Sequence, residues 1–140
     1  MLKKKLRNIL LIDDSEADNF LNSRVIRRAD VAEKITITYG AQEALDYLMK
    51  AVSEDVYPKP EIVFLDINMP GMSGWDFLDA YEQLDERMKA GIIVCMLTTS
   101  HAPRDQAKAA EYAVLSDFTN KPLTKEKLME IIARSFPDHV

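Results

Sequence analysis

Residues 62–74 have the sequence Ile-Val-Phe-Leu-Asp-Ile-Asn-Met-Pro-Gly-Met-Ser-Gly, and this stretch decides the fold. Its first four residues form an unbroken apolar run, which predicts a short strand buried on both faces. Asp66 follows directly, and a carboxylate there is unfavourable unless it lies at the edge of the sheet with a partner. The Pro and Gly residues of 68–74 then predict a sharp turn, so we expect Asp66 to be accessible at the end of the strand.

Similar segments lie on both sides of this stretch. Four further strands are predicted, two from apolar runs, one from alternating residues and one short: 8–12, 92–97, 35–39 and 117–120. Amphipathic segments that predict helices follow each strand: 15–29, 41–52, 75–84, 103–112 and 124–135. Five alternating units, (βα)5, predict an α/β fold with a doubly wound, five-stranded parallel sheet. Ligands of such sheets bind beyond the carboxyl ends of the strands.

The composition fits one soluble domain. The chain has 140 residues, of which 47% are hydrophobic and 29% charged. We therefore expect a single domain over residues 1–140, with a core of about residues 7–136 and no output domain. The net charge of −5 argues against nucleic-acid binding, and the basic run at 3–7 is expected to be a solvated lead-in. No apolar stretch approaches the roughly 20 residues of a membrane span. The one cysteine, Cys95, lies in an apolar run, so the features together predict a cytoplasmic protein.

Three carboxylates are expected at one edge of the sheet. Asp13 and Asp14 end the first strand and Asp66 ends the third. Because uncompensated carboxylates repel one another, a hard cation with oxygen ligands, such as Mg2+, would stabilise the group. A carboxylate held beside a divalent cation can attack a phosphoryl group and form an aspartyl phosphate. The alternatives are capping of the next helix by Asp13 and Asp14, and a structural turn role for Asp66.

Two other strands also end in polar residues. The fourth ends in Thr98, Thr99 and Ser100, whose hydroxyls could donate to a phosphoryl oxygen or cap the next helix. The fifth ends at Asn120, followed by Lys121 and Pro122. A lysine in that place is usually solvated, but at this edge its ammonium could pair with Asp66 and then with a phosphate.

These residues resemble the receiver domains of two-component response regulators, of which the chemotaxis regulator CheY is the simplest example. The resemblance covers about residues 7–136 and is carried by LIDDS at 11–15, FLDINMPGMSGWDFL at 64–78, LTTS at 97–100 and NKP at 120–122. It implies a flavodoxin-like sheet with strand order 2-1-3-4-5. It also implies a single-domain signalling phosphoprotein that catalyses only its own phosphorylation and dephosphorylation within a phosphorelay.

The resemblance assigns a role to each matching position in the acidic site. It implies that Asp66 is the phosphoacceptor and that Lys121 contacts the phosphoryl group. Asp14 is implied as a direct Mg2+ ligand, with Asp66 beside it, and Asp13 as a ligand directly or through water. Asn68 is implied as a Mg2+ ligand through its backbone carbonyl.

The same resemblance implies a switch and a set of partners. Thr98 is expected to be the switch hydroxyl, with Thr99 as the open alternative, and Phe118 the switch aromatic. The partners implied are a histidine kinase or histidine phosphotransfer protein and an unknown downstream protein, with a possible homodimer through the face of helix 4, strand 5 and helix 5. The stretch LTTSHAPRD at 97–105, NKPLT at 120–124 and the long loop before the third strand resemble stand-alone receivers that partner phytochrome-type kinases. Residues 112–115, Tyr-Ala-Val-Leu, depart from the family, because many receivers have a glycine before the fifth strand.

Three rival functions share parts of this pattern. A phosphatase of the haloacid dehalogenase type also uses a strand-end aspartate, but it requires a second acid where this chain has Asn68. A flavodoxin-like electron carrier requires a phosphate-binding loop after the first strand, where Asp13 and Asp14 would repel a phosphate. A degenerate receiver that acts as a passive binding module is disfavoured because each position of the acidic site is retained.

Overall fold

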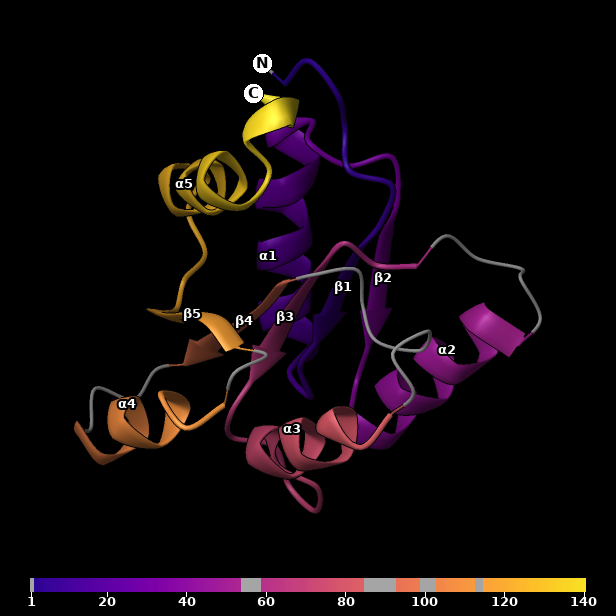
Figure 1. Cartoon of the computed structure of the whole chain (residues 1–140), viewed down its shortest axis with the longest axis vertical. Coiled ribbons are helices and arrows are strands. Elements are labelled where there is room, and N and C mark those ends of the chain that lie inside the picture. Colours follow the sequence, from indigo (N-terminus) through magenta and orange to yellow (C-terminus); the bar gives the residue numbers. More distant parts are fainter. Residues whose placement is uncertain (1, 54–58, 85–92, 99–102, 113–114) are drawn as a thin grey trace.

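The structure is a computed structural model that describes residues 2–53, 59–84, 93–98, 103–112 and 115–140. Its centre is a parallel sheet of five strands in the order β2-β1-β3-β4-β5 (Figure 1). The strands are β1 (Ile9–Ile12), β2 (Ile35–Thr38), β3 (Ile62–Asp66), β4 (Ile93–Thr98) and β5 (Leu115–Asn120). The helices are α1 (Glu16–Ala29), α2 (Ala41–Ser53), α3 (Gly74–Glu82), α4 (Pro103–Ala109) and α5 (Lys125–Ser135), followed by the short 3-10 helix η2 (Pro137–His139). The predicted fold class and strand order are confirmed.

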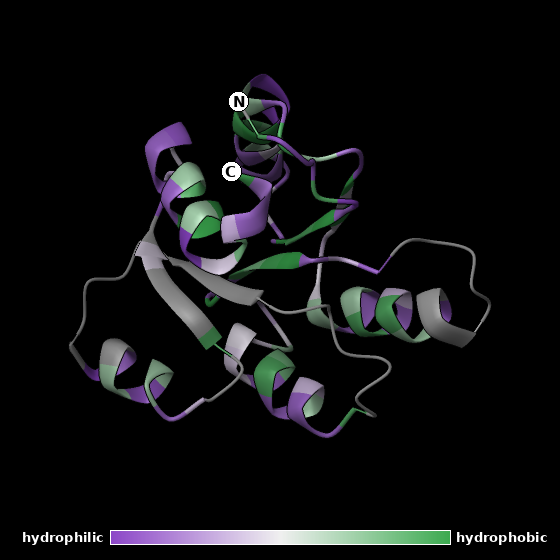
Figure 2. Cartoon of the chain, turned by 45° about the horizontal axis from the view of Figure 1, so that its top comes forward, coloured by the Kyte–Doolittle hydropathy of each residue, from purple (hydrophilic) through white to green (hydrophobic). Residues whose placement is uncertain are grey.

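Two apolar layers hold the helices against the sheet. The layer below α1 and α5 takes Ile9 and Leu11 from β1, and the layer below α2 and α3 takes Leu10 and Ile12 from the same strand. Alternate residues of one strand thus serve opposite layers. All residues of β1 and β3 are buried, whereas β2 at the edge is partly exposed, as the sequence predicts. Hydrophobic residues follow these inner strands, and the helices alternate hydrophobic and hydrophilic positions (Figure 2).

The element ends differ from the sequence-based expectations by a few residues. Helix α4 was predicted to reach Tyr112, but it ends at Ala109 and continues as a turn in which the Tyr112 amide donates to the Ala109 carbonyl. In this turn the Tyr112 side chain contacts Trp75 and Asp79 of α3, a distant interaction that the local helical pattern does not include. Strand β5 begins two residues before the predicted start, and its pairing with β4 shifts register between Val94 and Cys95.

The two termini meet at the end of the molecule opposite the carboxyl ends of the strands. The Lys3 amide donates to the His139 carbonyl at 2.7 Å, and the His139 Nδ1 lies 3.0 Å from the Lys4 carbonyl. Both ends of the chain are labelled together at the top of Figure 1. Among the described helices, none combines the length and apolar character of a membrane crossing.

Candidate functional site

The parallel sheet brings three predicted carboxylates together. Ile12 of β1 pairs with Leu65 of β3, so Asp13 leaves its strand beside Asp66. One carboxylate oxygen each from Asp13, Asp14 and Asp66 lies within 4.8 Å of the others. Asp13 and Asp66 are buried, at 4% and 6% exposure, whereas Asp14 is exposed. The acidic cluster is therefore built on rigid strand ends but open to solvent on one side.

A tight turn after β3 shapes this edge. The Gly74 amide donates to the Ile67 carbonyl at 2.9 Å, which brings the start of α3 against the end of β3. A Cβ at Gly74 would lie 2.5 Å from the Asp66 carbonyl oxygen, so only glycine fits there. Ser73 and Asp76 form a capping box that fixes the start of α3. Within this turn the backbone N–H of Asn68 donates to Asp66 Oδ1 at 3.4 Å.

The first turn of α1 holds Asp13 in place. Ser15 is the N-cap, and its side chain accepts from the Asp18 amide. The helix cap is therefore not an aspartate, which leaves Asp13 and Asp14 available for other contacts. Asp13 Oδ1 accepts from the Ser15 amide at 2.9 Å, and the Asn19 side chain donates to the Asp13 carbonyl at 2.8 Å.

Lys121 reaches into the cluster from the end of β5. Its ammonium lies 2.7 Å from Asp13 Oδ2, 2.8 Å from Asp18 Oδ2 and 3.4 Å from Asp66 Oδ1. The predicted contact with Asp66 is present, but the shorter contacts go to Asp13 and Asp18. Sequence reasoning missed Asp18. The signal that could have found it was its place as an acidic residue in the first turn of α1, directly after the acidic pair.

The electrostatics of the cluster are dominated by burial and like charge. Burial and the charge of Asp13 raise the pKa of Asp66 to about 6, against the lowering effect of Lys121 and of the Asn68 amide. Burial alone would lower the pKa of Lys121, but the hydrogen bonds to Asp13 and Asp18 and the charge of Asp66 raise it overall. The ammonium is thus firmly charged, and the carboxylates remain only partly compensated.

The described backbone places Thr98 at the carboxyl edge of the sheet and Phe118 two residues before that edge, on the neighbouring strand. Thr98 is the last residue of β4 and pairs with Asn120, and Phe118 of β5 pairs with Met96. Their side chains lie outside the described part of the structure, as do Thr99 and Ser100. The choice between Thr98 and Thr99 therefore stays open.

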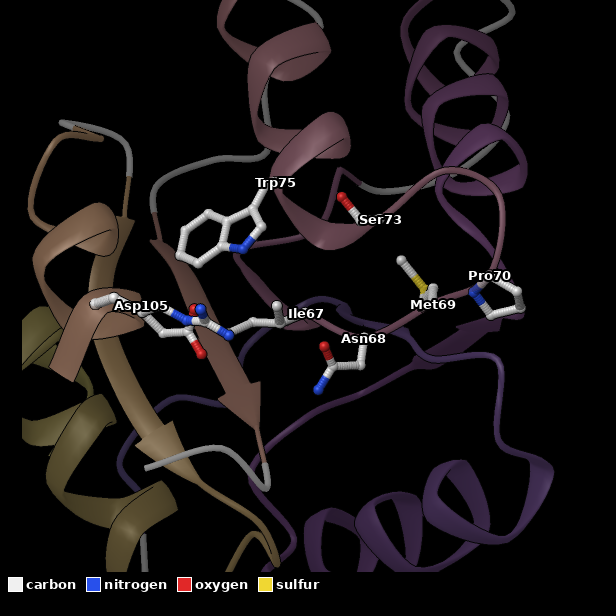
Figure 3. Close-up of a pocket in the computed structure, with 8 residues that line it drawn as sticks. Ile67, Asn68, Met69, Pro70, Ser73, Trp75 and Asp105 are labelled. Carbon is white, nitrogen blue, oxygen red and sulfur yellow. The ribbon is translucent and has the colours of Figure 1, made fainter. Parts of the chain in front are cut away.

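An open groove of about 630 Å³ adjoins the cluster. It lies between the turn after β3 and α4, with Asn68, Trp75 and Asp105 around it (Figure 3). Trp75 stacks on Tyr112 with ring centroids 5.8 Å apart, and the Tyr112 hydroxyl donates to Asp79 at 2.8 Å. Tyr112, the first residue of the segment that departs from the family pattern, therefore links the turn after α4 to α3.

The donor set of the cluster fits a hard divalent cation. All three side chains offer carboxylate oxygens, which Mg2+ prefers over nitrogen or sulfur. The exposure of Asp14 leaves one side open, as suits a cation that keeps several waters. Asp13, Asp14 and Asp66 are thus the residues that could hold it.

Comparison with known proteins identifies the family. The sequence model of one protein family, the response regulator receiver domain, matches residues 9–133. The chain therefore belongs to this family. A two-component response regulator from Cytophaga hutchinsonii has a similar structure, with a TM-score of 0.85 and 36% identity over 94% of this chain and 97% of the other. The response regulator Rcp1 of Synechocystis is 28% identical over 76% of this chain and 71% of its own.

A third relative bears on the subfamily. The bacteriophytochrome response regulator AtBRR has a TM-score of 0.75 and 28% identity, with 91% of each chain covered. The predicted resemblance to receivers of this kind is confirmed. The chain is thus a CheY-like receiver domain of two-component signal transduction, a class of proteins that partner histidine kinases. This membership decides against the phosphatase and the electron carrier.

Proposed function

We propose that Asp66 accepts a phosphoryl group from a histidine kinase or a histidine phosphotransfer protein. In this reaction an oxygen of Asp66 attacks the phosphorus, the bond from phosphorus to the donor nitrogen breaks, and the electron pair leaves with the imidazole. The observation that carries the proposal is the meeting of Asp13, Asp14, Asp66 and Lys121 at the carboxyl edge of the sheet. With a pKa of about 6, Asp66 is mostly ionised at neutral pH and can act as a nucleophile.

Each neighbour of Asp66 has a proposed part in this transfer. Asp13, Asp14, Asp66 and the backbone carbonyl of Asn68 would hold Mg2+, which when bound neutralises charge on the phosphoryl oxygens. Lys121 supplies a second positive charge and would move the short distance from Asp13 to a phosphoryl oxygen. The open groove beside Asn68 leaves room for the donor.

The proposed output is a changed protein surface. An aspartyl phosphate carries about −1.5 to −2 charges where the ionised carboxylate carried −1, and it adds phosphoryl oxygens as hydrogen-bond acceptors; such a change can shift a two-state element. Thr98 and Phe118 are the proposed elements, on the family pattern. The surface of α4, β5 and α5 is the proposed site for a downstream protein or for a second copy of the chain. Amide shifts on phosphorylation that stay away from this surface would contradict the assignment.

Incorporation of phosphate from acetyl phosphate tests the phosphoacceptor. Intact mass should show one phosphoryl group on the parent with Mg2+ and none with a chelator. Asp66→Asn should abolish the addition, whereas Asp138→Asn, which removes an exposed carboxylate near the C-terminus, should leave it unchanged. If the parent takes up no phosphoryl group, the chain is a passive binding module instead.

A further inference from the structure

Asp18 is a described residue of the site that contacts Lys121 and that the receiver pattern does not account for. It lies in the first turn of α1, and its Oδ2 is 2.8 Å from the Lys121 ammonium. Its side chain is 38% exposed, much more than those of Asp13 and Asp66. It does not belong to the group of three carboxylates whose oxygens lie within 4.8 Å of one another. Asp18 therefore contacts the lysine from outside the candidate metal site.

Lys121 occupies atoms that a metal ion would need. It contacts Asp13 Oδ2 at 2.7 Å, while Asp13 Oδ1 accepts from the Ser15 amide, so both oxygens of Asp13 already have a partner. It also approaches Asp66 Oδ1 at 3.4 Å. A cation that binds Asp13 and Asp66 would therefore meet the positive charge of Lys121 at close range, and the two repel each other.

We infer that Asp18 is a positioning residue for Lys121, which it holds at the rim of the acidic cluster so that a divalent cation can share Asp13 and Asp66 with it. The inference rests on the proposed function of the site. Without the Asp18 carboxylate, the described carboxylates left within reach of the ammonium are Asp13 and Asp66, both candidate metal ligands, so Lys121 would compete with the cation more strongly. With Asp18 present, Lys121 keeps a partner when the cation takes Asp13.

Mg2+ affinity of the unphosphorylated chain tests this role. Isothermal titration calorimetry with MgCl2 at physiological salt would compare the parent with Asp18→Asn and Glu16→Gln. Both variants remove one carboxylate from the first turn of α1, but Glu16 has an exposed side chain. We expect Asp18→Asn to weaken Mg2+ binding about tenfold. Glu16→Gln should weaken it less than about threefold, because an exposed charge is screened. Asp18→Glu, which keeps the charge, should restore most of the affinity.

A double-mutant cycle shows whether Asp18 acts through the lysine. In a Lys121→Met background the ammonium is absent, so Asp18→Asn should weaken Mg2+ binding no more than Glu16→Gln does. Equal effects of Asp18→Asn and Glu16→Gln in the parent would overturn the inference, and so would a full effect of Asp18→Asn without Lys121. The comparison in the parent stands even if Lys121→Met does not fold. If the parent itself fails to bind Mg2+, the proposed function of the site fails rather than the role of Asp18.

Discussion

Two polar groups lie at opposite ends of strand β1 and are built in opposite ways. Asn8 immediately precedes the strand and is fully buried, yet it is neutral and paired: it donates to the Tyr47 hydroxyl and accepts from Thr36, both at 2.9 Å. Asp13 immediately follows the strand, among carboxylates that share one ammonium. Four apolar residues separate the two groups. One strand thus carries a satisfied polar group at one end and an unbalanced one at the other.

The difference shows where this fold gains stability and where it gives some up. A buried polar group stabilises only if its hydrogen bonds are made, as at Asn8. Buried like charges destabilise, and the raised pKa of Asp66 expresses that repulsion. A cation or a phosphoryl group can act at the carboxyl end because the charge there is not already neutralised. Four substitutions test this comparison, from the largest expected effect to the smallest.

Gly74→Ala should have the largest effect, because it acts on the backbone that holds the acidic end. The new Cβ would lie 2.5 Å from the Asp66 carbonyl oxygen and 2.8 Å from the Ile67 Cα, neither of which is a flexible side-chain atom. We expect a loss of about 3 kcal/mol or more in the free energy of unfolding, with weaker Mg2+ binding. Urea denaturation and Mg2+ titration would measure both. Gly40→Ala is the control, since a Cβ there has no neighbour within 4 Å. Equal stability of the two variants would contradict the close approach.

Asp66→Asn should stabilise the metal-free chain. The pKa of Asp66 rises from 3.8 to about 6 on folding, so its protonation favours the folded state. That contribution is complete below pH 3.8 and is lost as the pH rises through about 6. Above this range the ionised carboxylate destabilises the fold, by at most about 2–3 kcal/mol. In urea denaturation with a chelator at neutral pH, Asp66→Asn should therefore have a higher free energy of unfolding than the parent.

Two measurements control the result for Asp66. The advantage of the variant should shrink as the pH falls through about 6, and Mg2+ at neutral pH should reduce it by stabilising the ionised parent. A difference in stability that does not change with pH would show that the charge of Asp66 is not its cause.

Asn8→Ala, at the other end of β1, should lower the free energy of unfolding, whereas Asp66→Asn should raise it. The Asn8 side chain is fully buried, and its loss removes its bonds to the Tyr47 and Thr36 hydroxyls, which lie 3.2 Å from each other. We expect a loss of about 2 kcal/mol in the free energy of unfolding. Mg2+ affinity should stay within about twofold of the parent, because the substitution removes no charge. A large change in Mg2+ binding would show that the two ends are coupled.

The sequence predicts the sheet well because its inner strands are buried on both faces. The apolar run of β3, ended by Asp66, has few other interpretations, and parallel topology then forces Asp13 and Asp66 together. The local sequence pattern does not predict the end of an element where a residue far away in the sequence contacts it. Tyr112 fits a continued helix, but its stacking on Trp75 and its bond to Asp79 lie beyond local pattern.

Asp18 shows the same limit within the site. Its contact with Lys121 joins residues 103 positions apart, and it depends on how the first turn of α1 faces the end of β5. Periodicity indicates which face of a helix is buried, but not which polar residue at its end meets a particular strand. The three carboxylates could be predicted because strand ends are fixed by topology, whereas the fourth could not.

Tyr47→Phe should have the smallest effect and separates hydrogen bonding from packing at the neutral end. The substitution removes only the hydroxyl, which accepts from Asn8 at 2.9 Å and lies 3.2 Å from the Thr36 hydroxyl. The ring still packs against the apolar layer below α2 and α3, and Asn8 keeps its bond from Thr36. We therefore expect a loss of about 1 kcal/mol in urea denaturation, less than for Asn8→Ala. A larger loss than for Asn8→Ala would mean that the hydroxyl, rather than the buried amide, is the centre of this group, and that the two ends of β1 differ less than the Asn8 contacts indicate.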